Sequence, residues 1–386
     1  MAQVSLDKPI VSVDWLHKNL EAENLVVLDG TISKSFDAGL QQIPNARFFD
    51  IKNKFSDTSG AFPNTFPSVA QFQSEARDLG INNDSYIVVY DDKGLYSSAR
   101  VWWLFKAFGY DNVAVLDGGF PEWLQAGYPT EPMTAYQGDK GNFKADIQQE
   151  YMRFYEDLKE ASKAKTHAIV DARSGERFHG KVPEPRAGLR SGNIPNSVNL
   201  PYTELLENGL LKHEGDLQVI FSNTLTTKSD PVIFSCGSGI TACILALGAE
   251  ISGYNNIAVY DGSWTEWGTL DPGTMEDPDE WTKDQLLAYI LIYVSNSDLK
   301  ESWKEREYIL SRVDKKVYQQ MHDRFDADSD YQSIQNIIKA VRAHDYYRND
   351  FADLFADIKL MAFADGSLHQ MEQMVYSQLR KILIDG

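Results

Sequence analysis

A chain of 386 residues is long enough for two or three domains, and its composition, 43% hydrophobic and 12% aromatic, excludes a disordered protein. A formal net charge of −19 argues against nucleic acid or an anionic membrane as a partner, because both bind basic surfaces. Two cysteines are too few for a disulfide framework, and we find neither a signal peptide nor a membrane span, so we expect a reduced, cytoplasmic protein.

The first two thirds of the chain contain one pattern twice. Residues 85–123 match residues 229–267 at a constant shift of 144 residues and without a gap, with Gly-Tyr, Asp-Gly and Glu-Trp pairs recurring in both. Each copy alternates short apolar strands with helices, which is typical of an open parallel sheet covered by helices on both faces. We therefore expect two α/β domains, at residues 1–133 and 150–278, with the polar segment 133–150 as a linker.

A third domain of a different kind is expected after the acidic, Pro- and Gly-rich segment 271–280. Glycines become rare beyond it. Apolar residues recur every three or four positions over 334–344, 351–363 and 371–383, which is the period of amphipathic helices. We predict an all-α helical bundle over residues 282–386.

Cys236 is the residue best suited to carry chemistry. It follows the apolar strand 232–235 (VIFS) and opens the loop 236–241 (CGSGIT) before a helix. Backbone N–H groups at such a helix start attract anions and lower the pKa of a thiol, which makes the cysteine a good nucleophile. At the shift of 144 residues Asp92 stands opposite, so we expect only the second repeat to be catalytic. We expect Cys243, on the following helix, in the core.

The segment CGSGITAC resembles the loop of 3-mercaptopyruvate sulfurtransferases, members of the tandem-domain rhodanese superfamily. Other segments that match this superfamily are YSSARVWWLFKAFG, LDGGFPEW, DARSGERFHGKVPEPR, SGNIPNSVNLP and YDGSWTEW. Thiosulfate sulfurtransferases carry two basic residues inside the loop, where this chain has the neutral Gly237 and Ser238. Because basic side chains favour the thiosulfate dianion, the neutral loop favours the monoanion 3-mercaptopyruvate. The resemblance implies a rhodanese-like fold for both α/β domains.

The resemblance also implies a two-step sulfur transfer without a cofactor. The Cys236 thiolate takes the sulfur of 3-mercaptopyruvate, releases pyruvate and carries a persulfide. A thiol acceptor, such as thioredoxin or a small thiol, or cyanide then removes the outer sulfur. Ser238 and Thr241 are the expected hydrogen-bond donors during transfer. The rest of the loop that holds the persulfide comprises Gly237, Gly239 and Ile240.

Two arginines match those that hold the substrate carboxylate in this family, Arg177 in GERF and Arg186 in EPR. A guanidinium binds a planar carboxylate through two parallel hydrogen bonds, although either arginine could instead form a surface salt bridge. Asp57 matches an aspartate of the first domain that faces the active site, but it could equally cap a turn. Asn64 stands where the family often has a histidine, which weakens a proton relay through Ser238.

The helical region resembles TerB-like domains over residues 362–372 (AFADGSLHQME). Acidic residues are thought to bind metal in some members, which would make Asp365 and Glu372 the candidates here. A helix cap and a solvated face explain the same residues, so we assign no metal site. Two other functions stay open: a thiosulfate sulfurtransferase, and a persulfide carrier whose helical tail docks the sulfur acceptor.

Overall fold

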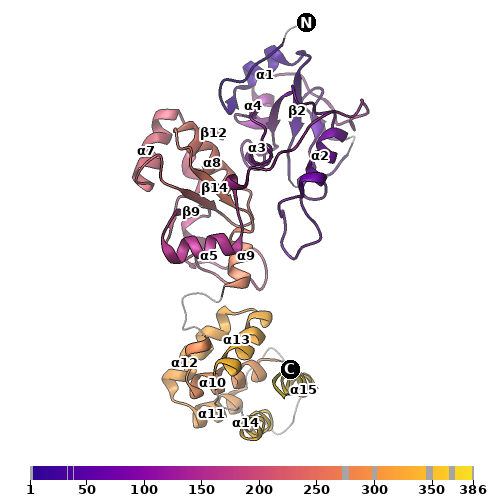
Figure 1. Cartoon of the computed structure of the whole chain (residues 1–386). Coiled ribbons are helices and arrows are strands. Elements are labelled where there is room, and N and C mark those ends of the chain that lie inside the picture. The colour runs from indigo at the N-terminus through magenta and orange to yellow at the C-terminus, as the bar shows by residue number, and fades with distance from the viewer. Residues whose placement is uncertain are drawn as a thin grey trace. The chain divides into compact units, whose positions relative to one another are not determined.

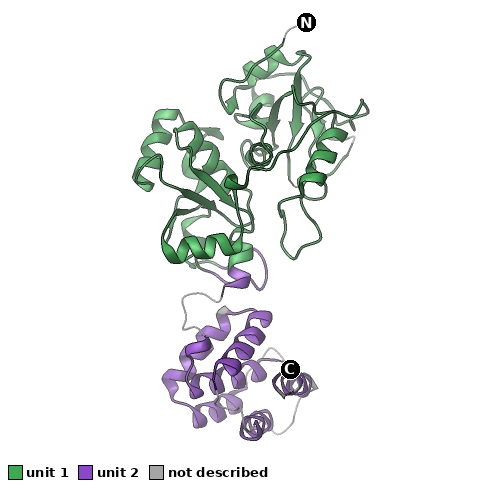
Figure 2. Ribbon diagram, viewed as in Figure 1, with its two compact units in different colours: residues 1–182, 192–267 green, residues 183–191, 268–386 purple. Residues whose placement is uncertain are grey.

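The computed structural model describes residues 3–32, 34–37, 39–271, 278–297, 302–344, 351–364 and 370–384. The chain divides into two compact units (Figure 2). Unit 1 comprises residues 1–182 and 192–267, and unit 2 comprises residues 183–191 and 268–386. Unit 1 contains both sequence repeats and is mixed α/β, whereas unit 2 is helical (Figure 1). Within the described residues, no helix is long and apolar enough to cross a membrane.

The first repeat is built on a five-stranded parallel sheet with the order β1-β6-β5-β2-β4. Side chains of successive strand residues point to opposite faces. Those of one face pack against α2 and α3, and those of the other against α1 and α4. The strands are β1 (Ile10–Val11), β2 (Leu25–Asp29), β4 (Arg47–Phe48), β5 (Tyr86–Tyr90) and β6 (Val113–Leu116). The helices are α1 (Val13–Asn19), α2 (Val69–Asp78), α3 (Ser98–Ala107) and α4 (Gly119–Gln125), and β3 (Gln41–Gln42) pairs with β7 (Glu131–Pro132).

The second repeat has the same topology, since its sheet order β10-β9-β13-β14-β8 is the first order read from the opposite edge. The prediction of two open parallel sheets with helices is therefore confirmed. The strands are β8 (Met152–Arg153), β9 (Ala168–Asp171), β10 (Ser197–Asn199), β13 (Val232–Ser235) and β14 (Ile257–Tyr260). The helices are α5 (Tyr155–Ala164), α6 (Gly175–Phe178), α7 (Glu214–Thr224), α8 (Ala242–Ile251) and α9 (Ser263–Leu270). Shorter elements are η1 (Gln149–Tyr151), η2 (Tyr202–Leu205), β11 (Leu206–Glu207) and β12 (Leu210–Leu211).

Helices α3 and α8 pack against each other and join the two repeats. Both are apolar around most of their circumference, because each faces its own sheet as well as the other helix. The segment between the repeats is also packed rather than loose. Phe143 is fully buried, its N–H donates to the carbonyl of Ile81, and its ring contacts Phe72, Phe105 and Tyr110.

The strand registers correct the gapless alignment of the repeats by one residue. Ile87 pairs with Val113, and Val232 pairs with Ile257, so the offset is 145 residues for the first strand and 144 for the second. The loop after the first strand is consequently one residue longer in the first repeat. It is Asp91, and not Asp92, that occupies the position of Cys236.

Unit 2 is an all-helical domain in which α10 is buried on nearly every side. Hydroxyl side chains of Thr282, Ser302 and Ser329 begin three of its helices as capping boxes. The helices predicted near 334–344, 351–363 and 371–383 are confirmed. The described helices of this unit are α10 (Lys283–Ser295), α11 (Trp303–Arg312), α12 (Lys315–Ala327), α13 (Asp330–Ala343), α14 (Ala352–Ala362) and α15 (Gln370–Ile384), and η3 (Pro278–Glu280) precedes them.

Candidate active site

Cys236 lies directly after β13, the central strand of the second sheet, at the carboxyl edge of that sheet. Only 1% of its surface is exposed. The loop that it opens is fastened to the start of α9. The carbonyl of Cys236 accepts the N–H of Trp264 at 2.9 Å, and the carbonyl of Gly237 accepts the N–H of Thr265 at 3.0 Å and its hydroxyl at 2.5 Å. The carbonyl oxygens of the first two loop residues are therefore both hydrogen-bonded to residues of α9.

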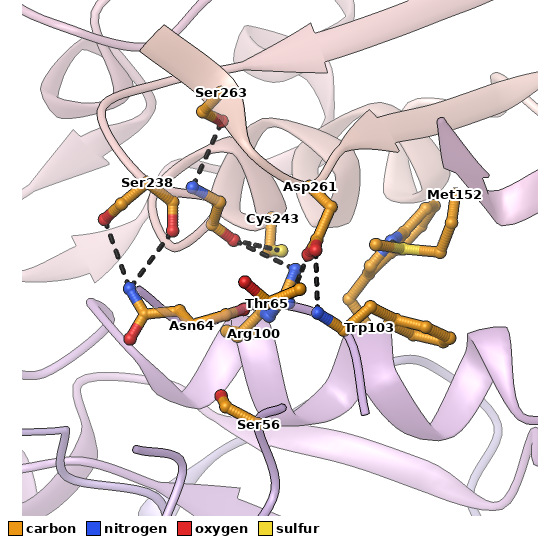
Figure 3. Close-up of polar contacts among 12 residues, drawn as sticks. Ser56, Asn64, Thr65, Arg100, Trp103, Met152, Ser238, Cys243, Asp261 and Ser263 are labelled. Atoms are coloured by element: carbon orange, nitrogen blue, oxygen red, sulfur yellow. Dashed lines mark hydrogen bonds and ion pairs between the residues drawn. The ribbon is translucent and has the colours of Figure 1, made fainter. Parts of the chain in front are cut away.

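Ser263, the first residue of α9, holds the loop in place through two hydrogen bonds, a role that the sequence analysis did not predict. Its hydroxyl oxygen accepts the N–H groups of Cys236 and Gly239, both at 3.1 Å, and lies 3.8 Å from the Cys236 sulfur. The bond from Gly239 is drawn in Figure 3. Ser263 has a left-handed backbone with φ of +50°, which is rare for a residue with a side chain. The corresponding residue of the first repeat is Gly119, with φ of +53°. A serine where the other repeat has glycine was the available signal.

The first repeat shows what such a loop binds. The Asp91 side chain is fully buried. One of its carboxylate oxygens accepts the N–H groups of Tyr96 at 2.8 Å and of Ser97 and Ser98 at 2.9 Å, and also the Ser98 hydroxyl at 2.7 Å. The N–H of Lys93 donates to the other oxygen at 2.9 Å. The backbone of this loop is thus a binding site for an anion, and the chain's own carboxylate fills it.

The same positions of the second repeat are Ile240, Thr241 and Ala242, which begin α8 as Tyr96, Ser97 and Ser98 begin α3. Cys236 stands in place of Asp91. Two backbone hydrogen bonds support this correspondence: Phe120 N–H donates to the Asp91 carbonyl at 3.0 Å, as Trp264 N–H does to that of Cys236. The equivalent loop of the first repeat therefore binds a carboxylate at the position where a sulfur anion on Cys236 would lie.

At both glycines of the loop, a side chain would make a close steric contact. Gly239 has φ of +74°, and a Cβ there would lie 2.5 Å from the carbonyl oxygen of Asp261. A Cβ at Gly237 would lie 3.1 Å from a terminal nitrogen of Arg177. The guanidinium of Arg177, in α6, therefore lies beside the nucleophile loop, and its predicted role in substrate binding stays a prediction.

Tyr96 of the first repeat is a further residue beside the site, and we did not single it out from the sequence although it lies in a matching segment. Partial burial raises the pKa of its phenol, the neighbouring Tyr202 and Cys236 raise it further, and Arg177 acts in the opposite sense. The Tyr96 and Tyr202 rings meet edge to face, with centroids 6.2 Å apart. A phenol near both the thiol and the guanidinium can donate a hydrogen bond to a bound substrate.

Arg100 of the first repeat also contacts the nucleophile loop, and only 1% of its surface is exposed. Its guanidinium donates to Asp261 at 2.6 Å and to the Gly239 carbonyl at 3.3 Å (Figure 3). The thiol of Cys243 donates to the same carbonyl at 3.4 Å. Burial raises the pKa of Cys243 to about 12, and the residue is in the core as predicted. The Gly239 carbonyl oxygen therefore has two side-chain donors, one from each repeat.

The remaining predicted site residues differ in what surrounds them. Ser238 is half-buried and accepts hydrogen bonds from Asn64, and Ile240 is buried. Asp57 accepts the N–H of Ser59 at 2.8 Å and its hydroxyl at 2.6 Å, which lowers the pKa of Asp57 and is the geometry of a turn. Its predicted contact with substrate stays a prediction.

Arg186 belongs to unit 2, and its side chain is exposed. Its predicted role also stays a prediction. Of the two acidic residues considered for metal, Glu372 is 2% exposed on α15, whereas Asp365 lies outside the described residues. Among the side chains that the structure describes, no group of three or more His, Cys, Asp or Glu could hold a metal ion.

The comparison with known families matches the two repeats one by one. The sequence pattern of the rhodanese-like domain fits residues 12–126 and residues 154–270. The chain belongs to the rhodanese family. The match ends before α10, so the helical domain is an addition to the two rhodanese-like domains, and its likeness to TerB-like domains stays a prediction.

Known relatives cover the same part of the chain. The 3-mercaptopyruvate sulfurtransferase of Mus musculus is 37% identical over 283 residues, which are 69% of this chain and 94% of the relative. The thiosulfate sulfurtransferase of Rattus norvegicus is 38% identical with the same shares. The crystal structure of SseA from Escherichia coli, a 3-mercaptopyruvate sulfotransferase, aligns with a TM-score of 0.60 and 32% identity, over 67% of this chain and 99% of SseA.

These relatives identify the enzyme class. This rhodanese-family chain is a sulfurtransferase, since relatives with that activity are matched over nearly their full length. Two of them are named for different sulfur donors at almost equal identity. The donor must therefore be argued from the site itself.

Proposed function

We propose that the chain transfers the sulfur of 3-mercaptopyruvate to a thiol or cyanide through a persulfide on Cys236. One observation carries the proposal. Cys236 stands where the first repeat has the Asp91 carboxylate, bound by three N–H groups at 2.8 to 2.9 Å. A persulfide anion at Cys236 is a charge of the same sign at the same position, so the N–H groups from 240 to 242 would stabilise it. A nucleophilic thiol needs a reducing environment, and a cytoplasmic location would supply one.

The contact of Arg177 with Gly237 favours 3-mercaptopyruvate as the donor. A Cβ at position 237 would lie 3.1 Å from a terminal nitrogen of the guanidinium, which would have to move by a few tenths of an ångström to make room for it. Glycine keeps Arg177 beside the loop, where it can bind the carboxylate of a keto acid through two parallel hydrogen bonds. The sequence motif alone supports Arg186 as a second carboxylate ligand. The neutral loop has no further cation for a dianion such as thiosulfate.

The first half-reaction forms an S–S bond between Cys236 and the substrate sulfur. The C–S bond of the substrate breaks and its electron pair stays on carbon, which takes up the proton that the substrate thiol contributed. Pyruvate leaves, and Cys236 holds the persulfide anion. In the second half-reaction an acceptor thiolate bonds to the outer sulfur, and the S–S bond breaks to return the Cys236 thiolate. Cyanide would take the sulfur as thiocyanate. Ser238 and Thr241 would donate hydrogen bonds to the sulfur.

The proposal is tested by sulfur transfer to dithiothreitol, with 3-mercaptopyruvate and thiosulfate as parallel donors at equal concentration. We expect a higher kcat/KM with 3-mercaptopyruvate and no transfer by a Cys236→Ser variant, in which the weaker nucleophile cannot form a persulfide. A higher kcat/KM with thiosulfate would refute the choice of donor and favour the activity for which the rat relative is named. Transfer by the serine variant would refute the persulfide itself.

A further inference from the structure

We infer that the helical domain sets the affinity of the enzyme for 3-mercaptopyruvate, because Gln332 and Arg190 are positioning residues for the turn that carries Arg186. The inference rests on the proposed function, in which Arg186 binds the substrate carboxylate, and deepens it. It assigns a task to a domain that lies beyond both rhodanese-like matches.

The segment 183–191 lies within the second rhodanese-like match, yet it belongs to unit 2 (Figure 2). It contains neither a helix nor a strand. Arg186 begins a turn in this segment, since the N–H of Leu189 donates to the Arg186 carbonyl at 3.3 Å and Gly188 has φ of +74°. A segment without regular structure is held in place by individual contacts, and Arg190 makes two of them directly after the turn.

Arg190 is bound by Asp271. The Nε atom of Arg190 donates to the backbone carbonyl of Asp271 at 3.0 Å, and a terminal nitrogen donates to the carboxylate at 3.2 Å. The exposed fractions of the two side chains are 8% and 17%. A guanidinium that makes two hydrogen bonds to one residue has a fixed orientation, so this pair holds the end of the turn against Asp271.

Gln332 of α13 binds the same carbonyl of Asp271. Its amide nitrogen donates to the carbonyl oxygens of Asp271 and of Gly268, both at 3.3 Å. Gly268 lies in the last turn of α9, where carbonyls have no partner within the helix. The amide oxygen of Gln332 accepts the N–H of Ser329 at 2.8 Å and its hydroxyl at 3.0 Å, which caps α13. One side chain, 4% exposed, therefore begins α13 and also holds the residue that binds Arg190.

These contacts connect the helical domain to the predicted substrate ligand through residues of unit 2 alone. Helix α13 holds Asp271, Asp271 holds Arg190, and Arg190 ends the turn that begins at Arg186. Loosening this network should weaken the binding of the substrate carboxylate. None of its residues belongs to the nucleophile loop, so the sulfur chemistry should continue. The expected sign is a raised KM for 3-mercaptopyruvate at an unchanged kcat.

The test is the steady-state rate of pyruvate release by the full chain, measured against 3-mercaptopyruvate concentration with saturating dithiothreitol. Arg190→Ala should raise KM about tenfold and Gln332→Glu about fivefold, with kcat changed by less than about twofold. Glutamate still accepts the hydrogen bonds of the capping box, but it has no hydrogen to donate to the two carbonyls. Arg190→Lys, whose ammonium can still donate to Asp271, should recover part of the loss in Arg190→Ala.

Gln285→Glu is the matched control. Gln285 stands at the same position of the capping box that begins α10, is 6% exposed, and donates from its amide nitrogen to Gln320 of α12. The substitution makes the same chemical change in the same domain, so a general loss of stability would act in both variants. The KM for 3-mercaptopyruvate should stay unchanged in Gln285→Glu.

A double-mutant cycle shows whether the network acts through Arg186. Arg186→Ala should raise KM about 30-fold, because it removes hydrogen bonds to a charged group. Adding Gln332→Glu to Arg186→Ala should raise KM by a further factor of about 1.5 at most, since the positioned side chain is already absent. An equal effect of Gln332→Glu in both backgrounds would overturn the inference. So would a loss confined to kcat, or the same rise in KM in Gln285→Glu.

Failure of the inference and failure of the proposed function give different results. If Arg186→Ala raises KM but Arg190→Ala and Gln332→Glu do not, the proposed function stands and the inference alone is refuted. If Arg186→Ala leaves KM unchanged, Arg186 is not a carboxylate ligand and the inference falls with that role. If the unaltered chain releases no pyruvate, the proposed function is refuted together with the inference.

Discussion

Replacing Asp91 tests the correspondence between the two loops. The Asp91 carboxylate is fully buried and accepts four backbone N–H groups and one hydroxyl at distances from 2.7 to 2.9 Å. Asp91→Ala removes the acceptor and leaves these donors in a buried loop without one. Hydrogen bonds to a charged group contribute about 1.5–3 kcal/mol each, but they are not additive, and removal of the carboxylate also removes its desolvation cost. We expect a loss of about 3–5 kcal/mol in the free energy of unfolding.

Thermal unfolding of the full chain, followed by circular dichroism and calorimetry, measures this loss. For a unit of this size about 1 kcal/mol corresponds to about 2–4 °C, so the transition of the α/β unit should fall by about 10 °C. Asp92→Ala is the matched control. Partial burial and the charge of Asp91 raise the pKa of Asp92, so its ionised form costs stability near neutral pH. Its removal should not lower the Tm. A larger loss for Asp92→Ala than for Asp91→Ala would refute the assignment of Asp91 to the position of Cys236.

Three further outcomes follow from the site. Arg177→Lys should raise KM for 3-mercaptopyruvate about tenfold or more, because an ammonium cannot form two parallel hydrogen bonds, and an unchanged KM in steady-state assays would remove Arg177 from the substrate site. Cys243 should resist iodoacetamide at pH 8 in the folded chain and react after unfolding, since burial raises its pKa to about 12 and keeps the thiol protonated; peptide mass mapping checks this. Gly239→Ala should abolish persulfide formation, because its Cβ would lie 2.5 Å from the Asp261 carbonyl at φ of +74°, and full activity in this variant would contradict the loop geometry.

The fold could be predicted because its signals are local. Apolar runs such as 86–90 and 232–235 form strands buried on both faces, and the three-to-four residue period of 371–383 falls within α15. The error in the alignment of the repeats had a local cause as well. The Gly-Tyr and Asp-Gly pairs that follow the loop fit a constant shift, so they do not reveal the one additional residue inside the loop of the first repeat.

The contacts behind the nucleophile loop could not be predicted, because they join residues far apart in the chain. The Arg100–Asp261 pair spans 161 positions, and the hydrogen bond from Phe66 to Asp261 spans 195. No periodicity or motif in one sequence relates such positions. In the sequence Asn64 is only a departure from a family pattern, and its hydrogen bond to Ser238, 174 positions away, follows from the fold alone.

The most direct test of the account is the mass of the Cys236 peptide after the chain has reacted with 3-mercaptopyruvate and before any acceptor is added. We predict a gain of one sulfur atom on Cys236 alone, released as stoichiometric transfer when dithiothreitol is added, with one pyruvate formed per sulfur bound. Sulfur transfer without a sulfur adduct on Cys236, or an adduct on Cys243 in its place, would contradict the account.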